Sequence, residues 1–170
     1  MSIIDENLKM MNNPIKKLQF TDYDIEKYTR ALAHLTTQLE YFYCHLVKEQ
    51  GRDSKNTFYH MKFRPKIHQL AYVNIGRGFP KELMDGHWCY ILKDMGSKML
   101  VIPTVSIKDS SINEKYELDI DIVINNKPKK SRLQLSDIRS IDIQRIYGNK
   151  GYIEVTTSFE KIHNVIKDFI

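Results

Sequence analysis

The sequence predicts an α+β fold, in which a long helix precedes a small antiparallel β-barrel and a short amphipathic helix ends the chain. From Thr21 to Gln50 the apolar residues recur at helical spacing, and beyond about residue 55 they alternate with the period of strands. A chain of 170 residues suits one domain with an appendage. We therefore expect a helical N-terminal extension over residues 1–62 and a barrel domain over residues 63–170.

The predicted long helix carries a sustained heptad seam, with apolar residues spaced alternately three and four apart. The seam consists of Ile25, Tyr28, Leu32, Leu35, Leu39, Phe42 and Leu46. Thr21 with Asp24 resembles a capping box and Gly51 is a plausible stop, so we expect a helix over about 22–49. The positions that flank the seam are weakly polar or apolar. This favours packing on the protein body or on a second subunit over an isolated zipper.

Three strands are expected in the first half of the barrel: Ile67–Ile75, His87–Lys93 and Lys98–Pro103. The sequence DMGS between the last two is a tight turn, in which Gly96 can adopt positive φ. Residues 116–124, YELDIDIVI, alternate strictly and predict a half-buried strand. We expect NNKPKK to be the turn that follows and SRLQL to be the hairpin partner. Thr157 with Glu160 forms a capping box ahead of the C-terminal helix.

The composition limits the class of protein. The chain has a formal charge of +5 and a pI near 9.1, a moderate excess that favours encounter with polyanions. We interpret Cys44 and Cys89 as buried thiols in a reducing compartment, although a disulfide between them is neither excluded nor suggested. The first residues lack a signal-peptide pattern, and no apolar run is long enough to span a bilayer. We therefore expect a soluble, cytoplasmic protein without membrane attachment.

Four segments, in order, are similar to the motifs of a known protein family. LAYVNIG, 70–76, is similar to that family's opening strand, and the loop from Gly76 to Gly86 is close in length to the loop that follows it. HWCYIL, 87–92, falls where the family has its "RPVLVI" strand. VIPTVSIK, 101–108, is similar to "VAPITSK". DIRSIDIQRI, 137–146, against the family's "QIRTIDKSRL", is the most specific match. Together these segments resemble the PemK/MazF ribonuclease toxins.

The resemblance implies an SH3-like barrel and a metal-independent endoribonuclease that cuts single-stranded RNA without a cofactor. In this family the 2′-hydroxyl of the RNA attacks the adjacent phosphorus and leaves a 2′,3′-cyclic phosphate and a 5′-hydroxyl. The resemblance also implies a homodimer whose RNA groove follows the two-fold interface, restrained by a cognate antitoxin. Family antitoxins are mostly proteins, though some relatives use RNA.

Two departures from the family pattern define the candidate catalytic residues. His87 stands where the family strand opens with arginine, and Trp88 replaces the proline. The family's Thr-Ser pair becomes Val105-Ser106, and a threonine remains one place early, at Thr104. Histidine titrates near neutrality and can act as acid or base. We expect His87 to face Ser106 and Thr104, whose hydroxyls would donate to the phosphate.

The candidate RNA-binding residues are Arg139, Lys108, Trp88, Arg77, Lys129 and Lys130. Arg139, at the family's arginine position, or Lys108 would replace the missing positive charge. Trp88 would stack on a base, and the KPKKSR tip would contact the RNA backbone. Each also has a structural interpretation: Arg139 pairs with a neighbouring aspartate, Trp88 belongs to the core, the basic tip is solvated surface, and His87 caps a strand.

Two other functions are open at this point. The same barrel occurs in toxins that bind DNA gyrase and cleave nothing, and a non-catalytic RNA-binding module would share the same surface. Cys44 and His45 have no second Cys-His pair at zinc spacing, so no metal site is expected. The long helix could also regulate the site by occupying the groove in which an antitoxin segment normally lies.

Overall fold

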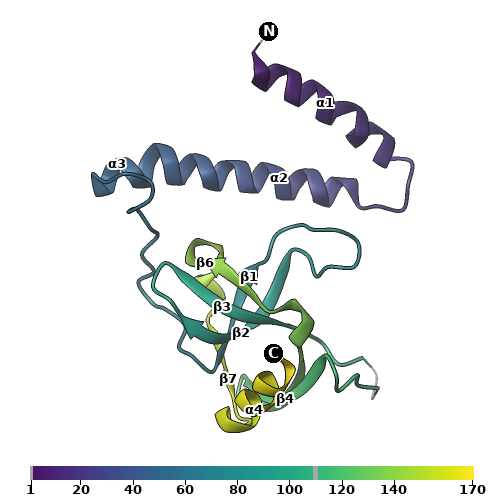
Figure 1. Ribbon diagram of the computed structural model, residues 1–170, viewed down its shortest axis with the longest axis vertical. Helices are drawn as coiled ribbons and strands as arrows, with labels where there is room; N and C mark the ends of the chain where they lie inside the picture. Colours follow the sequence, from purple (N-terminus) through teal and green to yellow (C-terminus); the bar gives the residue numbers. More distant parts are fainter. Residues whose placement is uncertain (1, 109–110) are drawn as a thin grey trace. The chain divides into compact units, whose positions relative to one another are not determined.

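The computed structural model describes residues 2–108 and 111–170, which fall into two compact units, Met1–Glu49 and Gln50–Ile170 (Figure 1). The division falls earlier than the expected boundary after residue 62. Part of the connector between the helices and the barrel, residues 51–65, belongs to the second unit, because Thr57 is buried and Tyr59 and Met61 pack against a core cluster of the barrel.

The first unit is a pair of helical segments. Helix α1 spans Ile3–Leu18, and α2 (Ile25–Glu40) continues through a π-helical segment (Tyr41–Leu46) into α3 (Val47–Gln50). The predicted long helix is therefore present, although its first α-helical residue is Ile25. Helix α1 was not predicted. Neither α1 nor α2 contains a buried residue, so the part of the heptad seam that lies in α2 is not enclosed within this unit, whereas Leu46 at the end of the seam is buried.

The helix caps differ from those predicted. Asp24 caps α2 by accepting a 2.9 Å hydrogen bond from the Lys27 N–H. Thr21 instead closes the end of α1, because its hydroxyl donates to the Leu18 carbonyl at 2.8 Å. The predicted cap at Thr21 is wrong because Asp24 is closer to the first turn and its carboxylate suits a helix N-terminus.

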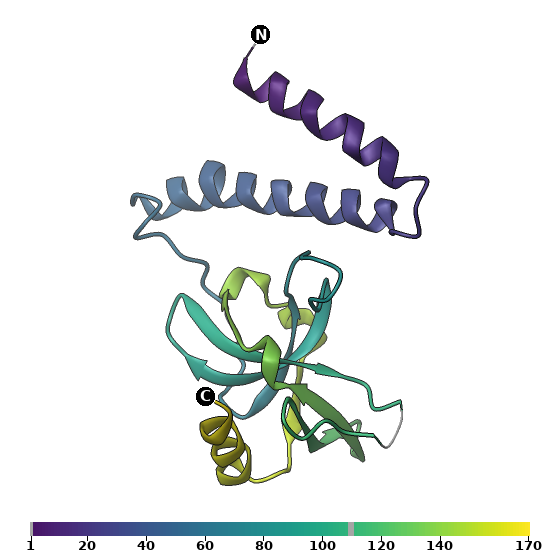
Figure 2. The same ribbon diagram turned by 45° about the vertical axis from the view of Figure 1, so that its right-hand side comes forward.

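The second unit contains a closed, six-stranded antiparallel barrel, as expected (Figure 1, Figure 2). Its strands are β1 (Gln69–Asn74), β2 (Gly86–Asp94), β3 (Lys98–Val105), β4 (Glu117–Ile124), β5 (Lys127–Gln134) and β7 (Tyr152–Val155). The order is β2-β1-β7-β4-β5-β3, and pairing of β2 with β3 closes the barrel. Strand β6 (Arg139–Asp142) pairs with the first half of β3.

Two hairpin turns determine the register of the barrel. Gly96 has φ +84° in the β2–β3 turn, as the sequence predicts. The β4–β5 turn is only Asn125-Asn126, with φ +52° and +59°, so the prediction that all of NNKPKK is a turn is wrong. Two asparagines tolerate the left-handed conformation that a two-residue hairpin requires, and the following KPKK therefore belongs to β5.

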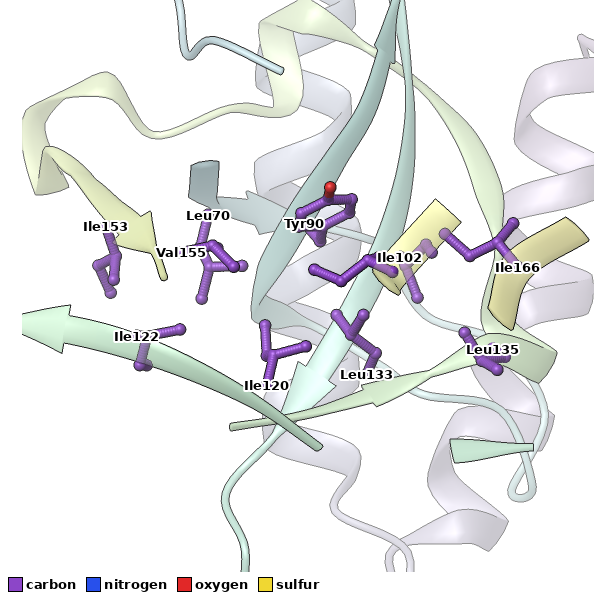
Figure 3. Packing of buried hydrophobic residues seen from close by; sticks show 11 residues of the cluster. Leu70, Tyr90, Ile102, Ile120, Ile122, Leu133, Leu135, Ile153, Val155 and Ile166 are labelled. Atoms are coloured by element: carbon purple, nitrogen blue, oxygen red, sulfur yellow. The ribbon is translucent and has the colours of Figure 1, made fainter. Parts of the chain in front are cut away.

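The barrel interior is a single apolar cluster to which every barrel strand contributes (Figure 3). Leu70, Tyr90, Ile102 and Leu133 are fully buried there. Helix α4 (Phe159–Phe169) adds Ile162 and Ile166 to it. We call the side of the strands that faces this cluster the inner face.

Helix α4 is present, as predicted, but its cap differs. Ser158 accepts from the Lys161 N–H at 3.3 Å, so it replaces Thr157 as the N-cap. The Thr157 hydroxyl is engaged elsewhere, because it accepts a 2.7 Å hydrogen bond from the backbone N–H of Asp121 in β4.

The opposite side of β1, β2 and β3, here called the outer face, carries a second apolar cluster. Its buried members are Ala71, Val73, Ile75, Cys89, Ile91, Met99, Val101, Ile141, Ile143 and Ile146. Both faces of these strands are thus buried. The outer face is covered by the connector and by the segment around β6, and the candidate site lies at its edge.

Candidate functional site

His87 lies near the start of β2, on the outer face. It pairs with Val73 of β1, and the next residue on its side of β2 is Cys89, which pairs with Ala71. The imidazole is half-buried, and its Nδ1 lies 3.1 Å from the backbone carbonyl oxygen of Thr104. A carbonyl only accepts hydrogen bonds, so this contact requires the proton on Nδ1 and leaves Nε2 with a lone pair when the ring is neutral.

Thr104 lies beside His87 but presents its side chain to the other face. It pairs with Leu133 of β5, an inner-face residue, and is only 5% exposed. Side chains alternate along a strand, so the Thr104 hydroxyl is on the inner face and only its carbonyl meets the imidazole. The expectation that His87 faces the Thr104 hydroxyl is therefore wrong. Ser106 is exposed and follows the end of β3.

Arg139 lies on the same side of the sheet as His87. It pairs with Val101, a residue of the outer-face cluster, and its guanidinium donates to the Asp137 carboxylate at 3.2 Å. Burial raises the pKa of the Cys89 thiol to about 12, and the Arg139 charge acts against this by lowering it. That influence requires the guanidinium to lie within electrostatic reach of Cys89, the outer-face neighbour of His87. Half-buried Arg139 thus places a cation on the outer face, and it also makes the predicted aspartate pair.

The other predicted RNA contacts do not converge on His87. Arg77 forms a 2.8 Å ion pair with Asp85 and is engaged within the loop that precedes β2. Trp88 faces inward, where it packs against the interior cluster and meets Tyr72 with ring centroids 5.5 Å apart.

Three predicted lysines, Lys108, Lys129 and Lys130, are exposed. Lys130 pairs in register with Asp121 and Lys129 with Ile122. The KPKK segment therefore forms the exposed first half of a strand. Its predicted contact with RNA backbone stays a prediction.

Sequence reasoning missed an aromatic and basic groove beside the outer face. It lies between the connector and the segment after β6, and its lining includes Tyr59, Lys62, Phe63 and Tyr147. The signal was present in the connector, whose TFYHMKFRP segment interleaves aromatic and basic residues. Only the fold shows that residue 147 joins them.

The two units differ in charge. Residues 1–49 carry 6 Lys or Arg against 7 Asp or Glu, and residues 50–170 carry 20 against 14. The second unit therefore holds a formal charge of +6 and the first holds −1. The basic character of the chain thus belongs to the unit that contains His87, Arg139 and the groove.

In the described part of the chain, no three His, Cys, Asp or Glu side chains are arranged to hold a metal ion. Among the same residues no helix combines the length and the apolar character needed to cross a bilayer. Cys44 is exposed and Cys89 is buried, both as free thiols, so the expectation that both are buried is wrong for Cys44.

No protein-family model and no curated protein sequence matches the chain.

Proposed function

We propose that this protein is a PemK/MazF-like toxin with an SH3-like barrel, which cleaves single-stranded RNA without a metal. The orientation of His87 carries the proposal. Its Nδ1 is held at 3.1 Å by the Thr104 carbonyl, so the neutral ring offers Nε2 as a base. A half-buried histidine whose far nitrogen is fixed by a hydrogen bond has the arrangement that general bases use in enzymes.

The positive charge of the site comes from Arg139. Because the family's arginine at the start of the strand is replaced by His87, the phosphate needs another cation. Arg139 shares the outer face with His87, and its side chain is oriented by Asp137. A guanidinium can bind two phosphate oxygens at once, which suits stabilisation of the charge that develops in the transition state.

The proposed reaction uses these two groups. His87 Nε2 takes the proton of an RNA 2′-hydroxyl, and that oxygen forms a bond to the adjacent phosphorus. The bond from phosphorus to the 5′-oxygen breaks, and this oxygen takes a proton from water. The imidazolium then returns its proton to the resulting hydroxide. The products are a 2′,3′-cyclic phosphate and a 5′-hydroxyl, and Arg139 neutralises the phosphate throughout.

The hydroxyl residues have smaller roles in this proposal than the family pattern implies. Ser106 is exposed beyond the end of β3 and can donate to RNA there. Thr104 contributes its carbonyl, which orients the base. The proposal also includes two partners. One is a second copy of the chain, which would form a homodimer, and the other is a cognate antitoxin, which is a protein in most of the family.

A second candidate function is a non-catalytic RNA-binding module. The observation that favours it is the inward direction of the Thr104 side chain, which keeps the Thr104 hydroxyl away from His87. The basic barrel unit would still attract RNA.

The two functions are separated by incubating the protein with end-labelled single-stranded RNA in EDTA, which silences contaminating metal-dependent nucleases. The toxin proposal expects fragments that end in 2′,3′-cyclic phosphate and 5′-hydroxyl. His87→Ala should slow their formation by about 10²- to 10⁴-fold, the usual contribution of a general base. Intact RNA that stays bound would favour the module, and inhibition of gyrase without an effect on RNA would favour a protein-binding toxin.

A further inference from the structure

The groove beside the outer face has the dimensions and the lining of a small binding site. Its volume is about 350 Å³, within the range of pockets that hold small organic groups. One wall is residues 59–63 of the connector and the other is residues 146–149. Gly148 lets the two walls approach closely, because a Cβ at this position would lie only 3.2 Å from the Met61 methyl group.

Each wall of the groove carries an aromatic residue that is in contact with, or adjacent to, a ring–ammonium pair. Phe63 is 72% exposed, with the Lys62 ammonium 5.5 Å from its ring centroid. On the other wall, the Tyr147 ring lies 5.8 Å from that of Tyr72, over which the Lys150 ammonium sits at 3.9 Å. The exposed Phe63 ring provides a flat surface on which a planar ring can stack.

The groove lies close to His87 in the register of the sheet. Ile146 forms a bridge with Val73 on one side of β1, and His87 pairs with the same Val73 on the other side. Neighbouring strands are about 5 Å apart, so the backbones of Ile146 and His87 are separated by about 10 Å. A strand of RNA whose phosphate lies at His87 can therefore place a neighbouring base in the groove.

We infer that this groove binds a base of single-stranded RNA next to the scissile phosphate, by stacking on Phe63 and contact of Lys62 with the backbone. The inference rests on the proposed function for the identity of the ligand. None of the groove's lining residues is acidic, and the unit that contains it carries +6, which together favour an anionic partner. Asn149, also in the lining, supplies an amide that can bond to the edge of the base.

Binding is measured by fluorescence anisotropy with a labelled single-stranded RNA of roughly a dozen nucleotides, within the site sizes of small barrels. Every variant is made in a His87→Ala background, so that cleavage does not consume the probe. Phe63→Ala should weaken binding by about 5- to 150-fold, the range measured for one stacked base, and Phe63→Trp should retain it. Lys62→Gln should lower the slope of log affinity against log salt by about 0.7.

The same barrel unit provides a matched control. The Lys115 ammonium lies 5.2 Å from the Tyr116 ring centroid, a geometry similar to that of Lys62 and Phe63, but outside the groove. Tyr116→Ala and Lys115→Gln should leave the affinity and the salt slope unchanged. Thermal unfolding of each variant verifies that it is folded. Because the Phe63 side chain is highly exposed, Phe63→Ala should fold normally.

The outcomes separate this inference from the proposed function. If Phe63→Ala and Lys62→Gln bind RNA as tightly as the parent, or if the control variants lose as much affinity, the groove is not the base site. The ribonuclease proposal would then stand or fall on cleavage by the His87-containing protein. If the groove variants lose binding but that protein never cuts RNA, the base site stands and the nuclease proposal is overturned.

Discussion

The two faces of strand β2 differ in what their buried residues can do. Trp88 and Tyr90 face inward, into a cluster closed by all six barrel strands and α4. His87, Cys89 and Ile91 face outward, toward a cluster covered only by short segments. The inner face holds the barrel together. On the outer face, Cys89 is fully buried, whereas the imidazole of His87 is partly exposed to solvent.

This difference shows how much one residue matters when a strand is compared with a family motif. Side chains alternate between faces, so a displacement of one position transfers a residue to the other face. Thr104, which the sequence resemblance aligns one place before the threonine of the PemK/MazF motif, lies on the inner face as the partner of Leu133. Its hydroxyl and the His87 imidazole are therefore separated by the sheet itself, although their residues are in contact.

The largest expected effect is on RNA cleavage, and it contrasts the two faces directly. His87→Ala should reduce the rate by about 10²- to 10⁴-fold, because it removes the group that we propose as the general base. Thr104→Val removes a hydroxyl but keeps the carbonyl that orients His87, so the rate should change by less than about threefold, well under the contribution of a catalytic group. Single-turnover cleavage of a labelled RNA measures both.

Ser106→Ala sharpens this comparison, because Ser106 is exposed beyond the end of β3. Loss of one hydrogen bond should reduce cleavage by about tenfold, between the other two variants. If Thr104→Val were as damaging as His87→Ala while its thermal stability was normal, the assignment of catalysis to the outer face would be wrong.

The next effect concerns thiol reactivity. Burial raises the pKa of Cys89 from 9.0 to about 12, which lowers its thiolate population near pH 8 by about a thousandfold. Cys44 is exposed. In the native protein, titration with a chromogenic disulfide should therefore detect Cys44 quickly, and Cys89 only after denaturant is added. Rapid reaction of the native Cys44→Ser variant would mean that the outer face is open to solvent at Cys89.

Stability tests whether the outer face is a true core. Ile102 on the inner face and Ile91 on the outer face are both 0% exposed. Ile102→Ala and Ile91→Ala should each lower the free energy of unfolding by about 2–5 kcal/mol, the usual cost of truncating a buried isoleucine. Ile67→Ala, at a residue 45% exposed, is the control and should cost less than about 1 kcal/mol. Urea unfolding in which only Ile91→Ala resembled the control would show that the outer cluster contributes little.

Local patterns predicted much of this fold. Strict alternation located β4, the heptad seam located the helix from Ile25 to Gln50, and Gly96 located a turn. Helix α1 was not predicted, although Ser2 and Asp5 form a reciprocal capping box at its N-terminus. Apolar residues recur there at helical spacing, but Pro14 lies in the interior, where proline usually ends a helix.

The candidate site was predictable only in part, because its geometry depends on pairing between distant segments. The sequence identifies His87 as a titratable residue at the start of a strand. The face of Thr104 is set by its pairing with Leu133, and the groove exists because residues 59–63 meet residues 146–149. Neither relation has a local signature, since each is determined by the closure of the barrel.

The smallest expected effect concerns the cover of the outer face. Arg64 ties the connector to the β2–β3 turn through two hydrogen bonds to Asp94, at 2.7 and 3.1 Å. Partial burial acts to raise the pKa of Asp94, but the Gly96 N–H and Arg64 outweigh it, so this pKa lies below its ordinary value of 3.8. The pair is about one-third exposed, so Asp94→Asn should cost only about 0.5–1 kcal/mol at neutral pH.

The sign of the pH dependence follows from that lowered pKa. Because the folded state holds the proton less tightly than the unfolded state, the contribution of Asp94 is complete above pH 3.8 and is lost as pH falls through the folded-state pKa. Urea midpoints of the parent and of Asp94→Asn should therefore differ near neutrality and converge in acid. A double-mutant cycle with Arg64→Gln isolates the pair, and a difference that persisted in acid would show that the ion pair does not hold the connector over the outer face.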